Sequence, residues 1–253
     1  TEVVLAVSGL GARSDRGTTA LAGVDLVVHA GEILGIAGVG GNGQSELAEC
    51  LLGLRTPTAG EIRIAGRDVS REGPGRTRAA GVSYVPEDRR REGLVLAFSV
   101  ADNLILGKQA RAPYARAGVQ DHGAIRREGA RLAQEFDVRP PDPRAIAGNL
   151  SGGNQQKVVL GRELSEEPRL IIVSQPSRGL DIAATEYVHD RLLEQRARGA
   201  AVLLISSELD EVRALSDRIA VMYEGRIVAT LSAAEATEER LGLLMAGHRP
   251  EGA

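Results

Sequence analysis

The sequence contains few aromatic residues, one cysteine and four histidines. Four Tyr, two Phe and no Trp in 253 residues are too few for a surface that stacks nucleic-acid bases. The single Cys50 excludes an internal disulfide and favours a reducing compartment, and its leucine-rich surroundings predict a small core residue. The histidines lack partners at metal-ligand spacing, which disfavours a metal site at His29, His122, His189 and His248.

Neither a strong charge imbalance nor a long apolar run is present. The formal net charge of -3 gives no general attraction to a phosphate backbone, so we expect no nucleic-acid partner. No apolar run approaches the ~18 residues that span a bilayer, so any membrane role would go through a partner. The chain starts at Thr1 and enters a strand-like run at once, which we interpret as one piece of a longer polypeptide.

Short apolar runs alternate with helix-like stretches along much of the chain. The runs lie at 3–7, 23–28, 32–38, 170–173, 201–206 and 219–223, and helix-like stretches lie at 45–54, 185–199 and 207–216. The later runs are rich in Val, Ile and Leu without alternation, which is typical of parallel strands buried on both faces. The pattern predicts an α/β fold with a mainly parallel sheet.

Two regions depart from this alternation. Early strands sit close together around turns such as 59–68, which predicts an antiparallel β subdomain beside the parallel core. The stretch 97–165 has no buried-strand run but contains a helix-like segment at 125–138. We therefore expect a core built from 1–96 and 166–253, and a helical subdomain at 97–165.

The stretch GVGGNGQS, at 38–45, has the spacing of a phosphate-binding loop. It follows a strand and opens a helix, a context in which backbone N–H groups surround phosphate oxygens. The candidate residues are Gly38, Gly41, Gly43 and Ser45, but Gln44 stands where the pattern GxxxxGK[ST] requires lysine. The alternative, favoured by the missing lysine, is that the glycines only form a tight turn.

A second stretch, NLSGGNQQKVVLGREL at 149–164, places a serine and two glycines at the start of a helix. With the first loop, it closely resembles the ATP-binding cassette family, whose signature is LSGGQ. The resemblance continues through SQPSRGLD, at 174–181, to a D-loop position at Asp181, and covers nearly the whole chain. It implies a P-loop NTPase cassette with a RecA-like core sheet, an antiparallel β subdomain and a helical insertion.

Carried over residue by residue, the catalytic half of the cassette is missing. Gln44 replaces the lysine that pairs with phosphates, and Ser174 replaces the Walker B aspartate that orders Mg²⁺. Gln175 replaces the glutamate that would polarise water, and Ser207 replaces the switch histidine. Glu87 stands at the glutamine-loop position, where its carboxylate would repel phosphate. The first strands also lack an aromatic residue to stack on adenine.

The opposite edge of the cassette is retained. Cassettes of this family work as head-to-tail pairs, in which one domain's signature completes the other's ATP site. The resemblance implies this role for Leu150, Ser151, Gly152, Gly153 and Asn154. We therefore expect ATP and Mg²⁺ to bind at an interface with a partner cassette. The phosphate-binding loop of this chain itself is expected to be catalytically silent or to bind nucleotide weakly, with Ser45 as its candidate Mg²⁺ contact.

The combined motifs resemble the second cassette of bacterial importers whose ATPase subunit carries two fused cassettes. Nucleoside importers are most similar, and ribose and galactose importers follow. The resemblance implies the N-terminal half of the same polypeptide as partner, together with permease subunits and a solute-binding protein, at the cytoplasmic face of the membrane. Arg89, Arg90 and Arg91 follow the glutamine-loop position, either as a permease contact or as a solvated charged turn.

Three other functional classes compete with this interpretation. A working ATPase would bind Mg-ATP through Ser45 and the loop amides and take its base from another acid. Cassettes of DNA repair and chromosome maintenance carry long coiled coils, but the stretch from Asp88 to Asn149 has no heptad pattern. A structural or regulatory subunit with an idle signature stays open.

Overall fold

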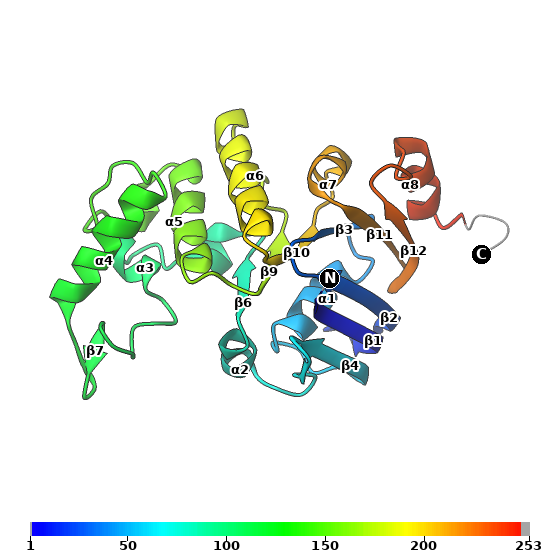
Figure 1. Cartoon of the computed structure of the whole chain (residues 1–253), viewed down its shortest axis with the longest axis horizontal. Coiled ribbons are helices and arrows are strands. Elements are labelled where there is room, and N and C mark those ends of the chain that lie inside the picture. Colours follow the sequence, from blue (N-terminus) through cyan, green and yellow to red (C-terminus); the bar gives the residue numbers. More distant parts are fainter. Residues whose placement is uncertain (1, 249–253) are drawn as a thin grey trace. The chain divides into compact units, whose positions relative to one another are not determined.

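The computed structural model describes residues 2–248. Thr1 and 249–253, which the predicted core domain includes, lie outside the described residues. The chain forms two compact units (Figure 1). Among the described residues, the first consists of 2–84, Pro168–Gln175 and 189–248, and the second of Val85–Glu167 and Pro176–Val188. No helix of the described part is long and apolar enough to cross a membrane.

A six-stranded sheet with the order β12-β11-β3-β10-β9-β6 forms the centre of the first unit. Its strands are β3 (Ile33–Ala37), β6 (Val82–Val85), β9 (Leu170–Ser174), β10 (Ala201–Ile205), β11 (Arg218–Tyr223) and β12 (Arg226–Ser232). β9, β10, β3 and β11 pair in parallel, whereas β12 pairs with β11 in the antiparallel sense. Every residue of β3, β9 and β10 is buried, as their unbroken apolar runs predict.

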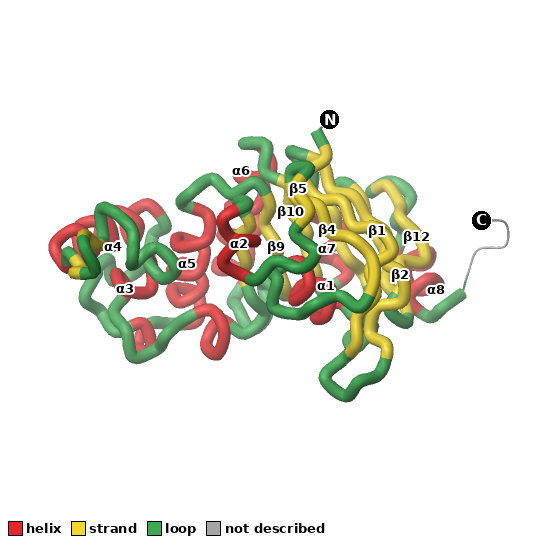
Figure 2. Tube along the Cα trace, turned by 90° about the horizontal axis from the view of Figure 1, so that it is seen from below, coloured by secondary structure: helices red, strands yellow, loops and turns green. Residues whose placement is uncertain are grey.

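A second sheet of the first unit is antiparallel and has the order β2-β1-β4-β5. Its strands are β1 (Val3–Arg13), β2 (Thr19–His29), β4 (Ala59–Ile64) and β5 (Arg67–Asp68). The buried side chains of helix α1 (Gln44–Leu51) share one hydrophobic core with strands of both sheets, and Figure 2 shows α1 between them. The predicted combination of a parallel sheet and an antiparallel β subdomain is confirmed.

The remaining helices of the first unit include α2 (Pro74–Ala79), α7 (Leu209–Leu215), α8 (Glu238–Met245) and the last part of α6 (Ile182–Ala197). Alternate residues of β11 serve two cores. Ile219 and Val221 pack with α7 and α8, whereas Ala220 and Met222 join the core around α1. This strand is therefore buried on both faces, as its unbroken apolar run predicts.

The second unit is mainly helical and is drawn largely in green in Figure 1. It contains a π-helical turn η1 (Arg89–Gly93), α3 (Val100–Leu104), α4 (His122–Glu135), a 3₁₀ turn η2 (Ala147–Asn149), α5 (Gly152–Leu164) and the first turns of α6. The short strands β7 (Ala115–Arg116) and β8 (Val119–Gln120) form a hairpin that the sequence analysis did not predict. Two-residue strands are too short to produce a detectable apolar alternation.

Candidate functional site

The glycine-rich loop at 38–43 connects β3 to α1. Gly41 and Gly43 have φ angles of 89° and 105°, which other residues rarely adopt. A Cβ on Gly43 would also lie 2.6 Å from the carbonyl oxygen of Ala20. The sequence therefore needs glycine at position 43 to bring the loop close to β2 and to begin α1 there.

Gln44 folds back onto this loop. Its Oε1 accepts a hydrogen bond from the backbone N–H of Asn42 at 3.0 Å, and its Nε2 donates to the carbonyl of Val39 at 3.0 Å. The Asn42 side chain donates to the same carbonyl at 2.9 Å. One neutral amide thus links both sides of the loop and occupies a backbone N–H that a phosphate could otherwise use.

The loop is also tied to the turn between β11 and β12. Glu224 N–H donates to Asn42 Oδ1 at 2.8 Å, and Gly225 N–H donates to the Asn42 carbonyl at 3.0 Å. The Gly225 carbonyl in turn accepts from Ala22 N–H on β2. This anchor could not be predicted from the sequence, because the turn residues Glu-Gly indicate a hairpin but not its distant partner.

Ser174, Gln175 and Ser207 follow two strands that run parallel to β3. Ser174 ends β9 opposite Ile205 of β10, and its side chain is buried. Gln175, at a φ of 47°, directs its Oε1 to Ser207, whose N–H and Oγ donate to it at 3.0 and 3.1 Å. The carboxyl ends of β3, β9 and β10 thus lie at one sheet edge, the usual place for ligand binding in such sheets.

The chemistry available at this edge is limited. Backbone N–H groups at the start of α1 suit phosphate oxygens. However, Gln44, Ser174, Gln175 and Ser207 carry no charge and offer no general base, and no described group of three His, Cys, Asp or Glu side chains could hold a metal ion. The donor set therefore fits a phosphate but does not fit Mg²⁺ with an activated water, and Ser45 contributes only an exposed hydroxyl.

The second unit carries the signature residues at the start of α5. Ser151 is the N-cap, and its Oγ accepts hydrogen bonds from Asn154, at 3.4 Å from the backbone N–H and at 3.0 Å from Nδ2. Asn154 Oδ1 accepts from the N–H of Arg139 at 2.8 Å. Leu150 is buried, which fixes the chain entering the helix. The signature turn is therefore held in place by its own side chains.

Two sequence candidates of the second unit have partners that were not predicted. Glu87 forms an ion pair with Arg178, so its carboxylate is engaged by a cation within the unit. Arg89 donates through Nη1 to the Arg178 carbonyl at 3.1 Å. Asp181 Oδ1 accepts from the N–H of Ala184 at 2.8 Å and so caps the start of α6.

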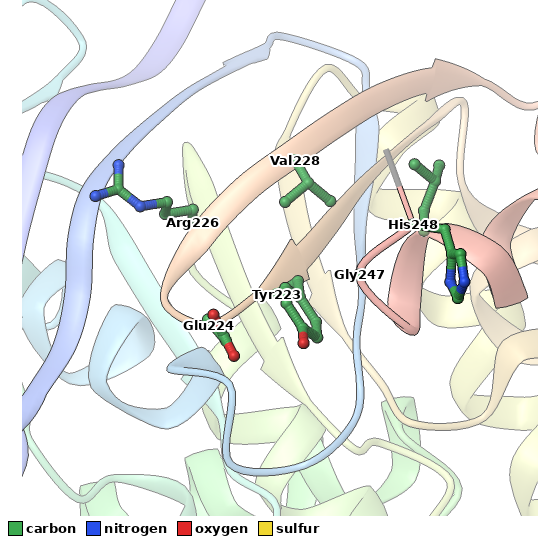
Figure 3. A pocket seen from close by; sticks show the side chains of 7 residues that line it. Tyr223, Glu224, Arg226, Val228, Gly247 and His248 are labelled. Carbon is green, nitrogen blue, oxygen red and sulfur yellow. The ribbon is translucent and has the colours of Figure 1, made fainter. Parts of the chain in front are cut away.

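A cavity of about 260 Å³ lies between the β11–β12 hairpin and the end of α8. Figure 3 shows Tyr223 and Glu224 at its lower side and His248 beside α8. None of the candidate residues named from the sequence lines it. Cys50 is buried as predicted, and burial raises the pKa of its thiol to about 11, so it is a poor nucleophile at neutral pH.

Comparison with known proteins identifies the family. The model of the family described as "ABC transporter" matches residues 21–178, which is more than half of the chain. The chain belongs to the ABC transporter family of ATP-binding cassettes. The resemblance to ATP-binding cassettes and the predicted fold class are confirmed, whereas the position as a second cassette stays a prediction.

Curated relatives of this cassette are import ATP-binding proteins. They include the guanosine import ATP-binding protein NupO of Bacillus subtilis, 47% identical over 96% of this chain and 48% of that protein. The nucleoside import ATP-binding protein NupA of Lactococcus lactis is 44% identical over 97% of this chain and 49% of that protein. The glucose import ATP-binding protein TsgD13 of Haloferax volcanii is 46% identical over 97% and 45%. The cassette thus spans about half the length of these relatives.

Solved structures with the same fold are also cassettes. An ATP-binding subunit of an ABC transporter superposes with a TM-score of 0.78 at 25% identity, covering 96% of this chain and 99% of that one. The ADP conformation of MJ1267, an ATP-binding cassette of an ABC transporter, gives 0.78 at 22% identity, covering 97% and 96%. The latter likeness is one of fold alone.

Proposed function

We propose that this cassette is one half of a two-cassette import ATP-binding subunit and that its own nucleotide site does not turn over ATP. The first part is supported by relatives that are import ATP-binding proteins of about twice its length. It functions as the second cassette, beside an N-terminal one in the same polypeptide. The two predicted subdomains, 1–96 with 166–253 and 97–165, correspond to a nucleotide-binding core and a signature-bearing arm.

The main support for a site that does not hydrolyse ATP is the hydrogen bonding between Gln175 and Ser207. An amide has no lone pair basic enough to take a proton from water, and this amide oxygen already accepts two hydrogen bonds from Ser207. Gln44 is likewise bonded within its loop and adds no positive charge for phosphate. The own loop therefore holds nucleotide weakly, through Gly38, Gly41, Gly43 and Ser45, and does not hydrolyse it.

The signature has a different role. Leu150 to Gly153 match the family signature LSGGQ, with Asn154 in place of its glutamine, and Ser151 caps a helix whose first N–H groups suit a phosphate. These residues and Asp181 act on ATP and Mg²⁺ held by the partner cassette. The chain thus contributes to catalysis in trans.

The transported solute is a nucleoside. The relatives NupO and NupA, named for guanosine and nucleoside import, support this choice, together with the neutral Ser174 and Gln175. Sugar is the second candidate, because TsgD13, a glucose import protein, is 46% identical. Permease subunits and a solute-binding protein complete the transporter, with this cassette bound at the cytoplasmic face of the membrane.

The rival function is a cassette that binds and hydrolyses ATP by itself. It requires tight Mg²⁺-dependent ATP binding and turnover by the isolated chain. We expect weak binding that changes little when Mg²⁺ is chelated, and hydrolysis at background level. Calorimetric titration with ATP, with and without EDTA, and a phosphate-release assay measure both. Turnover at the rate of an active transporter would refute the silent site.

A further inference from the structure

The side chain of Arg89 is turned onto the signature. A Cβ on Gly152 would lie 2.7 Å from Arg89 Nη2 and 3.5 Å from its Cζ, so the guanidinium packs directly against the first residue of α5. The Nε of Arg89 is buried and has no hydrogen-bond partner among the described residues. A larger residue at position 152 would displace the guanidinium from this position.

The same guanidinium reaches the segment that leads to Asp181. Its Nη1 donates to the carbonyl of Arg178 at 3.1 Å, while Glu87 pairs with the side chain of Arg178. Arg178 is therefore held at its backbone by one residue and at its side chain by another. Asp181, which follows in the same loop, caps α6 through the N–H of Ala184.

We propose that Arg89 is a positioning residue for ATP turnover. It keeps the first turn of α5 and the segment from Arg178 to Asp181 in one arrangement, so that the signature and the D-loop meet the partner's nucleotide together. This inference rests on the proposed function, in which both segments act on the partner cassette. Arg89 acts through these segments and does not itself contact nucleotide.

The contacts give the carboxylate of Glu87 a partner within the unit. In the sequence its carboxylate stands at the glutamine-loop position, where it would repel phosphate. In the folded unit the carboxylate is bound by Arg178, so it serves to hold a loop and not to bind a ligand.

These contacts should affect activity more than stability. The side chains of Glu87 and Arg178 are 39% and 68% exposed, and exposed ion pairs contribute little to the free energy of folding. The planar fork of Arg89 can donate to a carbonyl and lie flat on Gly152 at once, which a lysine cannot do. Its removal should leave the fold intact and loosen the two segments.

The test uses the complete transporter containing this chain. We expect Arg89→Ala to lower kcat for ATP by about tenfold with KM nearly unchanged, because misplaced groups cost rate while ATP stays bound to the partner's loop. The melting temperature should stay at the wild-type value, and Arg89→Lys should restore little of the rate. Arg126→Ala, on an exposed position of α4, is the matched control and should keep the wild-type kcat.

A second variant tests the contact itself. Gly152→Ala pushes the guanidinium aside without removing it, so it should lower kcat as well, and combining it with Arg89→Ala should add little further loss. Wild-type kcat in Arg89→Ala, a loss that tracks a fall in melting temperature, or independent losses that multiply in the double variant would each overturn the inference.

Gly152→Asp separates this inference from the proposed function. If Gly152→Asp abolishes ATP turnover while Arg89→Ala keeps the wild-type kcat, the positioning role of Arg89 is refuted. The proposal that the signature acts on the partner's ATP site is then still supported. If Gly152→Asp itself has no effect, the signature is idle and the proposed function fails. In that case the positioning role fails with it.

Discussion

Among single residues, two glutamines distinguish the nucleotide site that this cassette would form on its own loop. Gln44 bonds the backbone of its own loop, and Gln175 accepts two hydrogen bonds from Ser207. In our proposal, each stands at a position where the resemblance to the family implies a charged side chain. Both polar atoms of the Gln44 amide and the amide oxygen of Gln175 therefore already have hydrogen-bond partners within the protein.

Introducing a lysine at position 44 should strengthen ATP binding without causing ATP hydrolysis. We expect Gln44→Lys to raise the affinity of the isolated chain for ATP by about tenfold, since a charge-assisted hydrogen bond contributes roughly 1.5–3 kcal/mol and the lost amide bonds offset part of it. Calorimetric titration measures the change. Gln120→Lys, the same substitution at an exposed position of β8, should leave the affinity unchanged. Equal affinity in wild type and Gln44→Lys would argue against the role assigned to Gln44.

At the scale of elements, the loop between β3 and α1 depends on its contact with β2 and with the β11–β12 turn. Gly43 lies close to the Ala20 carbonyl, and Asn42 bonds Glu224 and Gly225. The backbone shape of the loop is thus set by neighbouring strands. The shape of the loop therefore depends on these backbone contacts and not on a lysine at position 44.

Substituting two glycines of this loop should have different effects on stability. Gly43→Ala should lower the free energy of unfolding by about 2 kcal/mol or more, because the new Cβ meets the Ala20 carbonyl and position 43 has φ 105°. Gly40→Ala is the control, since a Cβ there meets no atom within 4 Å. Urea denaturation followed by circular dichroism gives both values. A loss in Gly40→Ala as large as that in Gly43→Ala would contradict the account.

Much of the fold could be predicted from the sequence, because strands such as β3, β9 and β10 are apolar throughout and buried on both faces. The partners of polar side chains could not. The bond between Asn42 and Glu224 joins positions 182 residues apart, and the ion pair of Glu87 with Arg178 joins positions 91 apart. No local pattern encodes such pairs. The subdomain bounds and the roles of the candidate site residues stay predictions.

At the scale of the whole molecule, stability depends on pH through buried carboxylates that tie strands together. Glu32 is 8% exposed, accepts from the backbone N–H of His29 at 2.7 Å and pairs with Arg218 at 2.9 Å. Burial alone would raise its pKa, but the hydrogen bonds from His29 and Arg218 bring the pKa below the ordinary value of 4.5. The carboxylate is therefore more stable as an ion in the folded chain.

Acidic pH should lower the stability of the folded chain through Glu32. A lowered folded-state pKa gives stability that is fully present above pH 4.5 and is lost as the pH falls through the lowered pKa. We expect the free energy of unfolding of wild type to fall more steeply below pH 4.5 than that of Glu32→Gln, which has no charge to lose. Denaturant titrations at a series of pH values measure this. Identical slopes for the two proteins would contradict the assignment.

The central claim is that this cassette serves its partner's site and not its own. Steady-state ATP hydrolysis by the complete transporter tests it most directly, comparing wild type with Gly152→Asp and Ser45→Ala in this chain. The account predicts that Gly152→Asp, which places a carboxylate where a phosphate docks, abolishes turnover, whereas Ser45→Ala leaves it nearly intact. Wild-type turnover in Gly152→Asp, or loss of turnover in Ser45→Ala, would contradict the account.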